Sequence, residues 1–369
     1  MFSTLDRDRL QQALALAHEA IGRSDPNPRV GCVIGSPEGQ TWATGSTQVP
    51  GSAHAEAAAL SQAQSKGLDL KGATAWVTLE PCAHHGRTPP CADALVRAGV
   101  ARVVVGSMDP FPQVNGQGVE RLRAAGVQVD VMPAEDPLAA ACRDLNIGFF
   151  SRIERGRPWV RMKIAASLDG RTALPDGTSQ WITQAPARID GHAWRKRSGA
   201  VLSGIGTVLE DNPRLDVREV PTLQQPLRVI VDSKLQTPAQ ARVLAPPGQV
   251  LIYAAEEATQ RQQALQDQGA EIVFFPGPHG KVDLSALVHD LGQRHVNEVH
   301  VEAGHKLNGS LLKAGLVDEL LVYMAPMLLG EGREMAQVGL LPGLQAAPRW
   351  QFIDVQRVGE DLRMRLKRT

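Results

Sequence analysis

Three stretches of sequence decide the fold of the first half of the chain: HAE at residues 54–56, EPC at residues 80–82 and PPC at residues 89–91. One imidazole and two thiolates are a ligand set that zinc prefers, and three protein ligands leave a fourth position for water. His54 and Glu56 would point about 200° apart inside a helix, so they can share a site only at a helix start. The PPC stretch also opens a helix, whose positive N-terminal end favours a thiolate. We therefore predict a zinc site held by His54, Cys82 and Cys91.

Glu56 distinguishes a catalytic zinc site from a structural one. Zinc with two thiolates and a neutral imidazole is formally uncharged, so the metal alone acidifies its water less, and an adjacent base compensates. We predict that Glu56 takes the water proton and later delivers it to a leaving amine. The alternatives are a closed structural site, with His84 or His85 as a nearby fourth ligand, or buried cysteines that bind no metal. A closed site would give Glu56 no role.

The segments around this site alternate between helix and strand. Apolar residues at helical spacing predict a helix over residues 5–22. Two short apolar runs, at 30–34 and 41–44, predict a hairpin. We further predict helices over 53–66, 91–98 and 118–125, and strands over 75–79, 101–106 and 127–131. This alternation predicts a largely parallel sheet covered by helices on both faces.

A change in composition near residue 150 predicts a second domain. The stretch SRIERGRP at 151–158 is charged and has no apolar face, which is typical of a linker. Beyond it, helices alternate with strands predicted near 159–165, 200–203, 227–231, 249–253, 271–275, 297–301 and 320–324. Two late alternating runs, 351–357 and 361–366, predict antiparallel strands that finish a mixed sheet. The 369 residues therefore divide into two α/β domains, 1–150 and 151–369.

The composition is that of a folded protein without a polyanionic partner. The chain has 39 Lys plus Arg against 39 Asp plus Glu, and 43% of its residues are hydrophobic. Zero net charge argues against binding to nucleic acid or a membrane surface, since both need a basic footprint. No stretch approaches ~18 uncharged apolar residues, and the N-terminus has no apolar signal segment, so we expect a cytoplasmic protein. The four cysteines, Cys32, Cys82, Cys91 and Cys142, do not make a disulfide scaffold in a chain of this length.

Long motifs in both halves resemble one enzyme family, the bifunctional deaminase–reductases of riboflavin biosynthesis. In the first half they are PNPRVGCVI at 26–34 and LEPCAHHGRTPPC at 79–91, where eight residues separate the cysteines instead of the two of the common deaminase signature. In the second half they are KIAASLDGRTA at 163–173, SQWIT at 179–183, GTVLEDNP at 206–213, VEAG at 301–304 and AGLVDEL at 314–320. The motifs span essentially the whole chain in the family's order.

The resemblance implies two consecutive reactions on a phosphorylated pyrimidine. A cytidine-deaminase-like α/β/α domain would use Zn²⁺ and Glu56 to remove the C2 amine of 2,5-diamino-6-(ribosylamino)-4(3H)-pyrimidinone 5′-phosphate as ammonia. A dihydrofolate-reductase-like α/β domain would then reduce the ribosyl group to ribityl, with NADPH as the hydride donor. The resemblance also implies a homo-oligomer.

The resemblance implies binding roles as well. In the deaminase half, Asn27 would contact the pyrimidine edge and the loop with His84 and Arg87 would bind substrate, although Asn27 also fits a turn and the loop also fits a solvated surface. NADPH would be held by Ala165, Trp181, Thr207, Asp211, Ser233, Gly304, His305, Lys306, Leu307, Asn308, Gly309 and Ser310. The reductase substrate would be held by Lys163, Ser179, Arg195, Leu215, Arg218 and Glu302, with Arg195 and Arg218 facing its phosphate.

Some of these residues also fit structural roles. Trp181 fits a hydrophobic core and Arg195 fits a solvated helix face. The GIG stretch at 204–206 lacks the third glycine of the dinucleotide-binding fingerprint. Lys163, a cation inside a predicted strand, favours function over packing. In the run DPFP at 109–112 the family commonly has Asn where this chain has Phe111, so we assign Phe111 no substrate role and keep Asp109 only as a weak candidate.

Two other classes of protein share the deaminase motif. A nucleic-acid-editing deaminase would need a basic channel, which the neutral charge balance opposes. A non-catalytic binding protein on the same folds would be expected to lose Glu56 first, and Glu56 is present. We therefore predict a bifunctional enzyme with a small phosphorylated substrate and no nucleic-acid or membrane partner.

Overall fold

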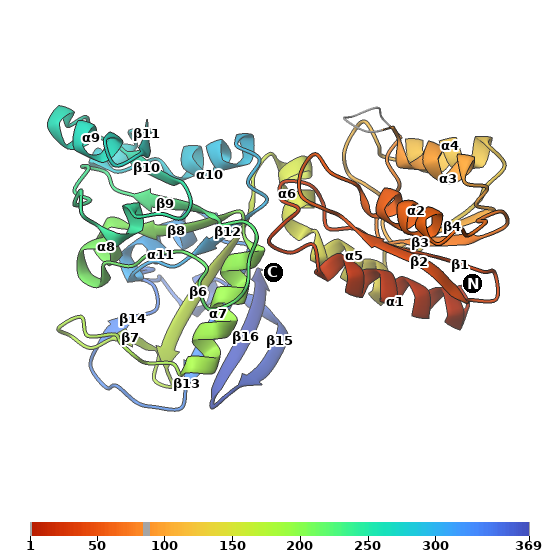
Figure 1. Ribbon diagram of the computed structural model, residues 1–369. Helices are drawn as coiled ribbons and strands as arrows, with labels where there is room; N and C mark the ends of the chain where they lie inside the picture. Colours follow the sequence, from red (N-terminus) through yellow and green to blue (C-terminus); the bar gives the residue numbers. More distant parts are fainter. Residues whose placement is uncertain (1, 84–88, 369) are drawn as a thin grey trace. The chain divides into compact units, whose positions relative to one another are not determined.

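The computed structural model describes residues 2–83 and 89–368, and the chain forms two compact units, Met1–Arg155 and Gly156–Thr369 (Figure 1). Each unit is built around its own sheet, of five strands in the first and nine in the second. The predicted fold class, two α/β domains, is confirmed. Within the described residues, none of the helices has the length and apolarity needed to cross a bilayer.

Unit 1 alternates helices with a five-stranded mixed sheet. The sheet order is β2-β1-β3-β4-β5, with β1 antiparallel to β2 and β3 and the other neighbours parallel. Its elements are α1 (Thr4–His18), β1 (Gly31–Gly35), β2 (Thr41–Ser46), α2 (Ala55–Ser65), β3 (Thr74–Val77), α3 (Cys91–Arg97), β4 (Arg102–Val105), α4 (Gln117–Ala124), β5 (Gln128–Val131), α5 (Pro137–Leu145) and α6 (Ile147–Arg155).

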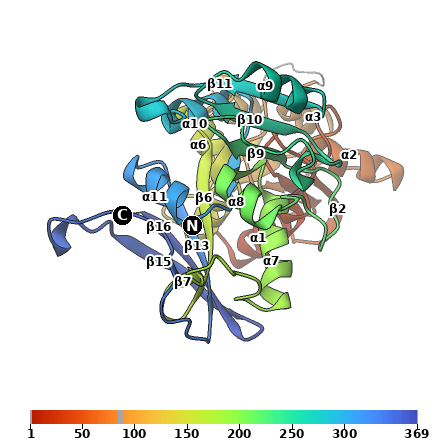
Figure 2. The ribbon, with the colours of Figure 1, turned by 90° about the vertical axis from the view of Figure 1, so that its left-hand side faces the viewer.

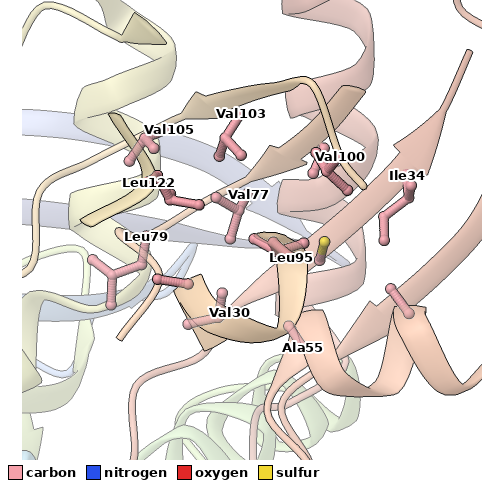
Figure 3. Close-up of a cluster of buried hydrophobic side chains, with 14 of the residues drawn as sticks. Val30, Ile34, Ala55, Val77, Leu79, Leu95, Val100, Val103, Val105 and Leu122 are labelled. Atoms are coloured by element: carbon pink, nitrogen blue, oxygen red, sulfur yellow. The ribbon is translucent and has the colours of Figure 1, made fainter. Parts of the chain in front are cut away.

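Alternate strand residues of unit 1 face two helical layers, as the period of two in a strand requires. On β3, Trp76 packs with α1 and α5, whereas Val77 packs with α2, α3 and α4. Figure 3 shows the second cluster, in which Val77, Val103 and Val105 lie beside Leu95 and Leu122. The predicted α/β/α arrangement of this domain is confirmed. Its core holds the starts of α2 and α3, which carry the predicted zinc ligands.

Unit 2 is built on a nine-stranded sheet of order β11-β10-β9-β8-β12-β6-β13-β16-β15. The strands from β11 to β13 are parallel, and β16 and β15 complete the sheet antiparallel. The strands are β6 (Trp159–Ser167), β7 (Arg171–Ala173), β8 (Ala200–Gly204), β9 (Leu227–Val231), β10 (Val250–Ala254), β11 (Ala270–Phe274), β12 (Glu298–Val301), β13 (Glu319–Ala325), β14 (Arg333–Glu334), β15 (Trp350–Val358) and β16 (Asp361–Arg368). The helices are α7 (Ala185–Arg197), α8 (Ile205–Asp211), α9 (Thr259–Gln266), α10 (Leu284–Gln293) and α11 (His305–Lys313), with short 3₁₀ turns at Arg242–Leu244, Pro278–Gly280 and Leu344–Ala346.

Helices cover both faces of this second sheet as well. Leu287 and Leu291 of α10 and Leu311 of α11 pack on one face, whereas Val208 of α8 and Leu265 of α9 pack on the other. In Figure 2, β15 and β16 form a long hairpin at one edge of the sheet. The predicted mixed sheet with late antiparallel strands is confirmed.

Two local predictions differ from the structure, and one strand pairing was not predicted. The charged stretch at 151–158 was expected to be a linker, but α6 continues to Arg155, because Phe149 and Phe150 earlier in that helix are buried in the unit 1 core. The first helix ends at His18 instead of residue 22, and turns follow it. The two-stranded pairing of β7 with β14 has too few residues to give an alternating pattern, and the sequence did not predict it.

Candidate active sites

His54, Cys82 and Cys91 meet at the N-terminal ends of two helices. His54 is the N-cap of α2, Cys91 is the first residue of α3, and Cys82 follows β3. The Sγ atoms of Cys82 and Cys91 lie 3.7 and 3.5 Å from Nδ1 of His54, and the three ligand atoms all lie within 4.8 Å of one another. Zinc–nitrogen and zinc–sulfur bonds at a tetrahedral angle separate N from S by about 3.6 Å. The three residues therefore fit a zinc ion.

The surroundings of the site suit acid–base chemistry. The thiol of Cys91 and the ring of His54 lower the pKa of Cys82 to about 4, and the Cys91 backbone N–H donates to Cys82 Sγ over 3.3 Å. Glu56, in the first turn of α2, is 4% exposed. Burial, together with nearby Cys82, raises the pKa of its carboxyl group to about 7. Glu56 can therefore exchange a proton near neutral pH, as a general acid–base must.

Buried Glu80 connects the Cys82 loop to the start of α4. A Cβ on Gly118 would lie 2.0 Å from the carbonyl oxygen of Pro81, so only glycine allows this approach of the two segments. The carboxylate of Glu80 accepts four backbone N–H bonds of 2.9–3.3 Å, from Asp109, Gly116, Gly118 and Val119. The role of Glu80 was missed by the sequence reasoning, because the four donors lie at least 29 residues away along the chain.

The other candidates of the deaminase half differ in their surroundings. Asp109 is buried, and burial raises its pKa to about 7, with Glu80 and Cys82 acting in the same direction. Phe111 packs against the unit 1 core and donates its backbone N–H to the Asp109 carboxylate over 2.8 Å. Asn27 lies in the turn before β1, where its N–H donates to the Ser24 carbonyl over 2.8 Å. His84 and Arg87 lie outside the described residues.

Unit 2 contains a groove of three adjoining cavities at the carboxyl ends of its parallel strands. The α8–α11 cavity, between the starts of those two helices, has a volume of about 630 Å³, the central cavity about 260 Å³ and the α7 cavity about 350 Å³. The first shares Thr207, Gly304 and His305 with the second, and the second shares Lys163 and Glu302 with the third. Open α/β sheets bind their ligands at the carboxyl ends of their strands.

Most of the residues predicted for the reductase line this groove. Three do not: Ser233, whose Oγ accepts the N–H of Val282 over 3.2 Å, Gly309, which packs against Gln337, and Leu215, which is buried in the core. The predicted cofactor residues that line it are Ala165, Trp181, Thr207, Asp211, Gly304, His305, Lys306, Leu307, Asn308 and Ser310. The predicted substrate residues that line it are Lys163, Ser179, Arg195, Arg218 and Glu302.

A charged cluster joins the central and α7 cavities. Burial lowers the pKa of Lys163, which lies in the middle of β6. Arg195 donates to both carboxylate oxygens of Glu302 and, over 2.8 Å, to the carbonyl oxygen of Asp216. Although burial opposes it, Arg195 holds the pKa of Glu302 well below its usual range. Partners among the described residues thus use three of the five N–H donors of Arg195.

The sequence reasoning missed four basic residues that line the groove. Lys281 and Arg333 line the α8–α11 cavity, and Arg188 and His192 line the α7 cavity. Arg188, His192 and predicted Arg195 share one face of α7 at spacings of four and three residues, so helical periodicity could have found the first two. Lys281 lies in a loop and gave no such signal.

The fold and the sites define the class of the protein, a zinc-binding deaminase domain followed by a reductase domain. Residues 3–107 match the model of the cytidine and deoxycytidylate deaminase zinc-binding region. Residues 158–364 match the model of the RibD C-terminal domain. The two matched regions fall in the two compact units.

Similarity over the full chain identifies the family. The chain is 41% identical to the riboflavin biosynthesis protein RibD of Escherichia coli (strain K12), over 98% of this chain and 99% of that one, and 38% identical to RibD of Aquifex aeolicus (strain VF5), over 100% of both. Acinetobacter baumannii RibD matches with a TM-score of 0.88 at 39% identity, covering 99% of both chains. A Thermotoga maritima diaminohydroxyphosphoribosylaminopyrimidine deaminase/5-amino-6-(5-phosphoribosylamino)uracil reductase matches with a TM-score of 0.87 at 31% identity and the same coverage. The chain belongs to the RibD family, the bifunctional deaminase–reductases of riboflavin biosynthesis.

Proposed function

We propose that unit 1 deaminates 2,5-diamino-6-(ribosylamino)-4(3H)-pyrimidinone 5′-phosphate, with His54, Cys82 and Cys91 as zinc ligands. The observation that supports this most is the set of three ligand atoms within 4.8 Å of one another beside the buried carboxyl group of Glu56. Zinc held by these three residues would acidify a water molecule. Glu56 takes a proton from that water and delivers it to the leaving amine. A C–O bond forms at C2, the C–N bond breaks and ammonia leaves.

Three residues of unit 1 are proposed to bind the substrate: Asn27, His84 and Arg87. The amide of Asn27 carries both a donor and an acceptor for a pyrimidine edge. His84 and Arg87 supply hydrogen-bond donors, and Arg87 supplies a positive charge for the phosphate.

The Glu56→Gln variant tests the deaminase proposal. We expect ammonia release to fall by at least about a hundredfold, because an amide cannot carry the proton, while zinc content stays at the wild-type level. Glu135→Gln, an equally conservative change at an exposed position of the same unit, should keep the wild-type rate. Ammonia release by Glu56→Gln at the wild-type rate would refute the assignment.

We propose that the groove of unit 2 binds NADPH in the α8–α11 and central cavities and the ribosyl group of the deaminated product in the α7 cavity. The connected cavities, with loops that follow β8 and β12, support this assignment. NADPH, when bound, would supply a hydride. Addition of a hydride at C1′ would open the C1′–O bond of the sugar ring, and the released oxygen would take a proton, which would leave a ribityl chain. Lys163, Arg195, Arg218 and Glu302 of the α7 cavity hold the sugar phosphate, together with Ser179 of the adjoining central cavity. Leu215 precedes Asp216, whose carbonyl oxygen accepts a hydrogen bond from Arg195.

Charge reversal on α11 tests the cofactor assignment. Lys306 lines the α8–α11 cavity, and Lys313 of the same helix is exposed outside it. We expect Lys306→Glu to weaken NADPH binding at least about tenfold, because a carboxylate would repel the cofactor phosphates, and Lys313→Glu to leave it unchanged. NADPH fluorescence on titration into each protein measures the binding. Equal affinities in both variants would contradict the assignment.

A further inference from the structure

The α7 cavity contains a histidine for which the proposed reduction has no role. His192 lies on α7, one turn before Arg195, and is 5% exposed. It lines the cavity together with Lys163, Arg195, Arg218 and Glu302. Its ring therefore lies among the groups proposed to hold the sugar phosphate.

The hydrogen bonds of His192 determine which ring nitrogen carries the proton. Nδ1 accepts the backbone N–H of Arg218 over 3.3 Å. A neutral imidazole has one donor and one acceptor, so its proton must be on Nε2. Among the described residues Nε2 has no hydrogen-bond partner, and it is not sealed from solvent as both ring nitrogens of His300 are. The N–H of Nε2 is therefore a free donor in the cavity wall.

The charges around His192 keep the ring neutral. Burial and the positive charges of Arg195 and Arg218 lower its pKa to about 4, against the opposite effects of Glu302 and Asp216. Lys163 and Glu219 also line the cavity. At neutral pH the ring is therefore an uncharged hydrogen-bond donor. The positive charge in the cavity comes from the cationic side chains around it.

We propose that His192 is a substrate-binding residue of the reductase, whose Nε2–H donates to a phosphate oxygen of the sugar phosphate. The proposal rests on the reductase function proposed above. The phosphate is the favoured acceptor because four cations line the same cavity, Lys163, Arg188, Arg195 and Arg218, and charge-assisted hydrogen bonds are the stronger ones.

Two amide substitutions separate this binding role from a structural one. An Asn amide reaches only as far as Nδ1, so His192→Asn keeps an acceptor for the Arg218 N–H but has no donor at the Nε2 position. A Gln amide reaches as far as Nε2, so His192→Gln keeps that donor and loses the acceptor. We expect His192→Asn to raise the KM for the deaminated substrate about tenfold or more, with kcat within about twofold, and His192→Gln to stay close to wild type. If the ring serves only to hold the Arg218 backbone, His192→Gln has the higher KM and His192→Asn stays close to wild type. That result overturns the proposal.

Calorimetric titration of the full-length protein tests the phosphate contact without turnover. We expect His192→Asn to weaken the binding of ribose 5-phosphate and to leave the binding of ribose unchanged. An equal loss for both sugars would overturn the phosphate assignment. If the wild-type protein does not oxidise NADPH with the deaminated substrate, the proposed reductase function fails. If it does and His192→Asn matches it, only the role of His192 fails.

Discussion

Arg161 and Glu319 form a fully buried ion pair that makes the stability of unit 2 depend on pH. Nη1 and Nη2 of Arg161 lie 2.8 and 3.0 Å from carboxylate oxygens of Glu298 and Glu319, and all three side chains are at most 1% exposed. Against the effect of burial, Arg161 and Arg365 lower the pKa of Glu319 to about 2. The folded protein therefore favours the ionised form of Glu319. The resulting contribution to the free energy of unfolding is fully present above the pKa that Glu319 has in the unfolded chain, and it is lost as the pH falls toward the folded-state pKa.

The expected loss is on the order of 3 kcal/mol between about pH 4.5 and pH 2. Urea unfolding at pH 6 and pH 3 measures the part of this loss that falls above pH 3, about 2 kcal/mol. A Glu319→Gln variant should be less stable at pH 6 and should show a weaker dependence on pH over this range. An unchanged slope in that variant would contradict the role given to Glu319.

Position decides the chemistry of the cysteines. Cys91 begins α3 within reach of His54, whereas Cys142 is buried, and burial raises the pKa of its thiol to about 12. We expect Cys91→Ser to lose bound zinc and Cys142→Ser to keep one zinc per chain, because Cys91 belongs to the group of ligand atoms around His54 and Cys142 does not. Metal analysis after dialysis measures the content. Equal zinc in the two variants would contradict the proposed ligand set.

Individual residues were predictable where their signal is local. His54, Glu56 and Cys91 could be placed because a helix start can be identified from neighbouring residues, and the structure begins α2 and α3 there. Lys163 was conspicuous as a cation within an apolar strand. The hydrogen bond of His192 to Arg218 joins positions 26 residues apart, and no pattern in the sequence predicts such a pair.

At the scale of elements, Glu80 connects two segments that meet only in the folded chain. Replacement by Gln leaves one amide oxygen for the four N–H donors and removes the negative charge at the start of α4. We expect Glu80→Gln to lower the free energy of unfolding by about 1–3 kcal/mol. Glu120→Gln, on the exposed side of α4, should change it by less than about 0.5 kcal/mol.

Chemical denaturation of the two variants measures the difference. If they are equally stable, the carboxylate of Glu80 does not hold the loop. Deamination should also slow in Glu80→Gln, because Glu80 lies two residues before Cys82 and accepts the backbone N–H of Asp109.

Long strands and helices were largely predictable, because apolar residues recur along them at the spacing of a strand or a helix. The strands from β8 to β13 follow the predicted runs within one or two residues. The exception at α6 has a physical reason: Glu154 and Arg155 are exposed, whereas Phe149 and Phe150 earlier in the same helix are buried. A composition signal cannot distinguish such a half-buried helix from a linker.

At the scale of the whole molecule, we propose a homo-oligomer that pairs through the outer edge of the unit 2 sheet. The edge strand β15 exposes Phe352 and Val355, with Leu362 on the neighbouring β16 also exposed. An exposed apolar edge strand is a template for pairing with a second copy. We expect Phe352→Asp to shift sedimentation toward the monomer and Leu223→Asp, an exposed apolar position elsewhere in unit 2, to leave it unchanged. A monomeric wild-type protein would contradict the proposal.

The neutral net charge is also a property of the whole molecule. Lys163, Arg195 and Arg218 line one cavity, yet nearby carboxylates such as Glu302 and Asp216 balance them. A small phosphorylated substrate needs only such a local cluster, whereas a polyanion would need a continuous basic surface.

The central claim is that one chain performs two reactions at two separate sites. The most direct test measures ammonia release and NADPH oxidation side by side in Glu56→Gln and Lys163→Met, with the first substrate and with the deaminated intermediate. We predict a crossed pattern. Glu56→Gln should release no ammonia but oxidise NADPH normally with the intermediate, and Lys163→Met should release ammonia normally but oxidise little NADPH. Loss of NADPH oxidation with the intermediate in correctly folded Glu56→Gln, or loss of ammonia release with the first substrate in correctly folded Lys163→Met, would contradict the claim.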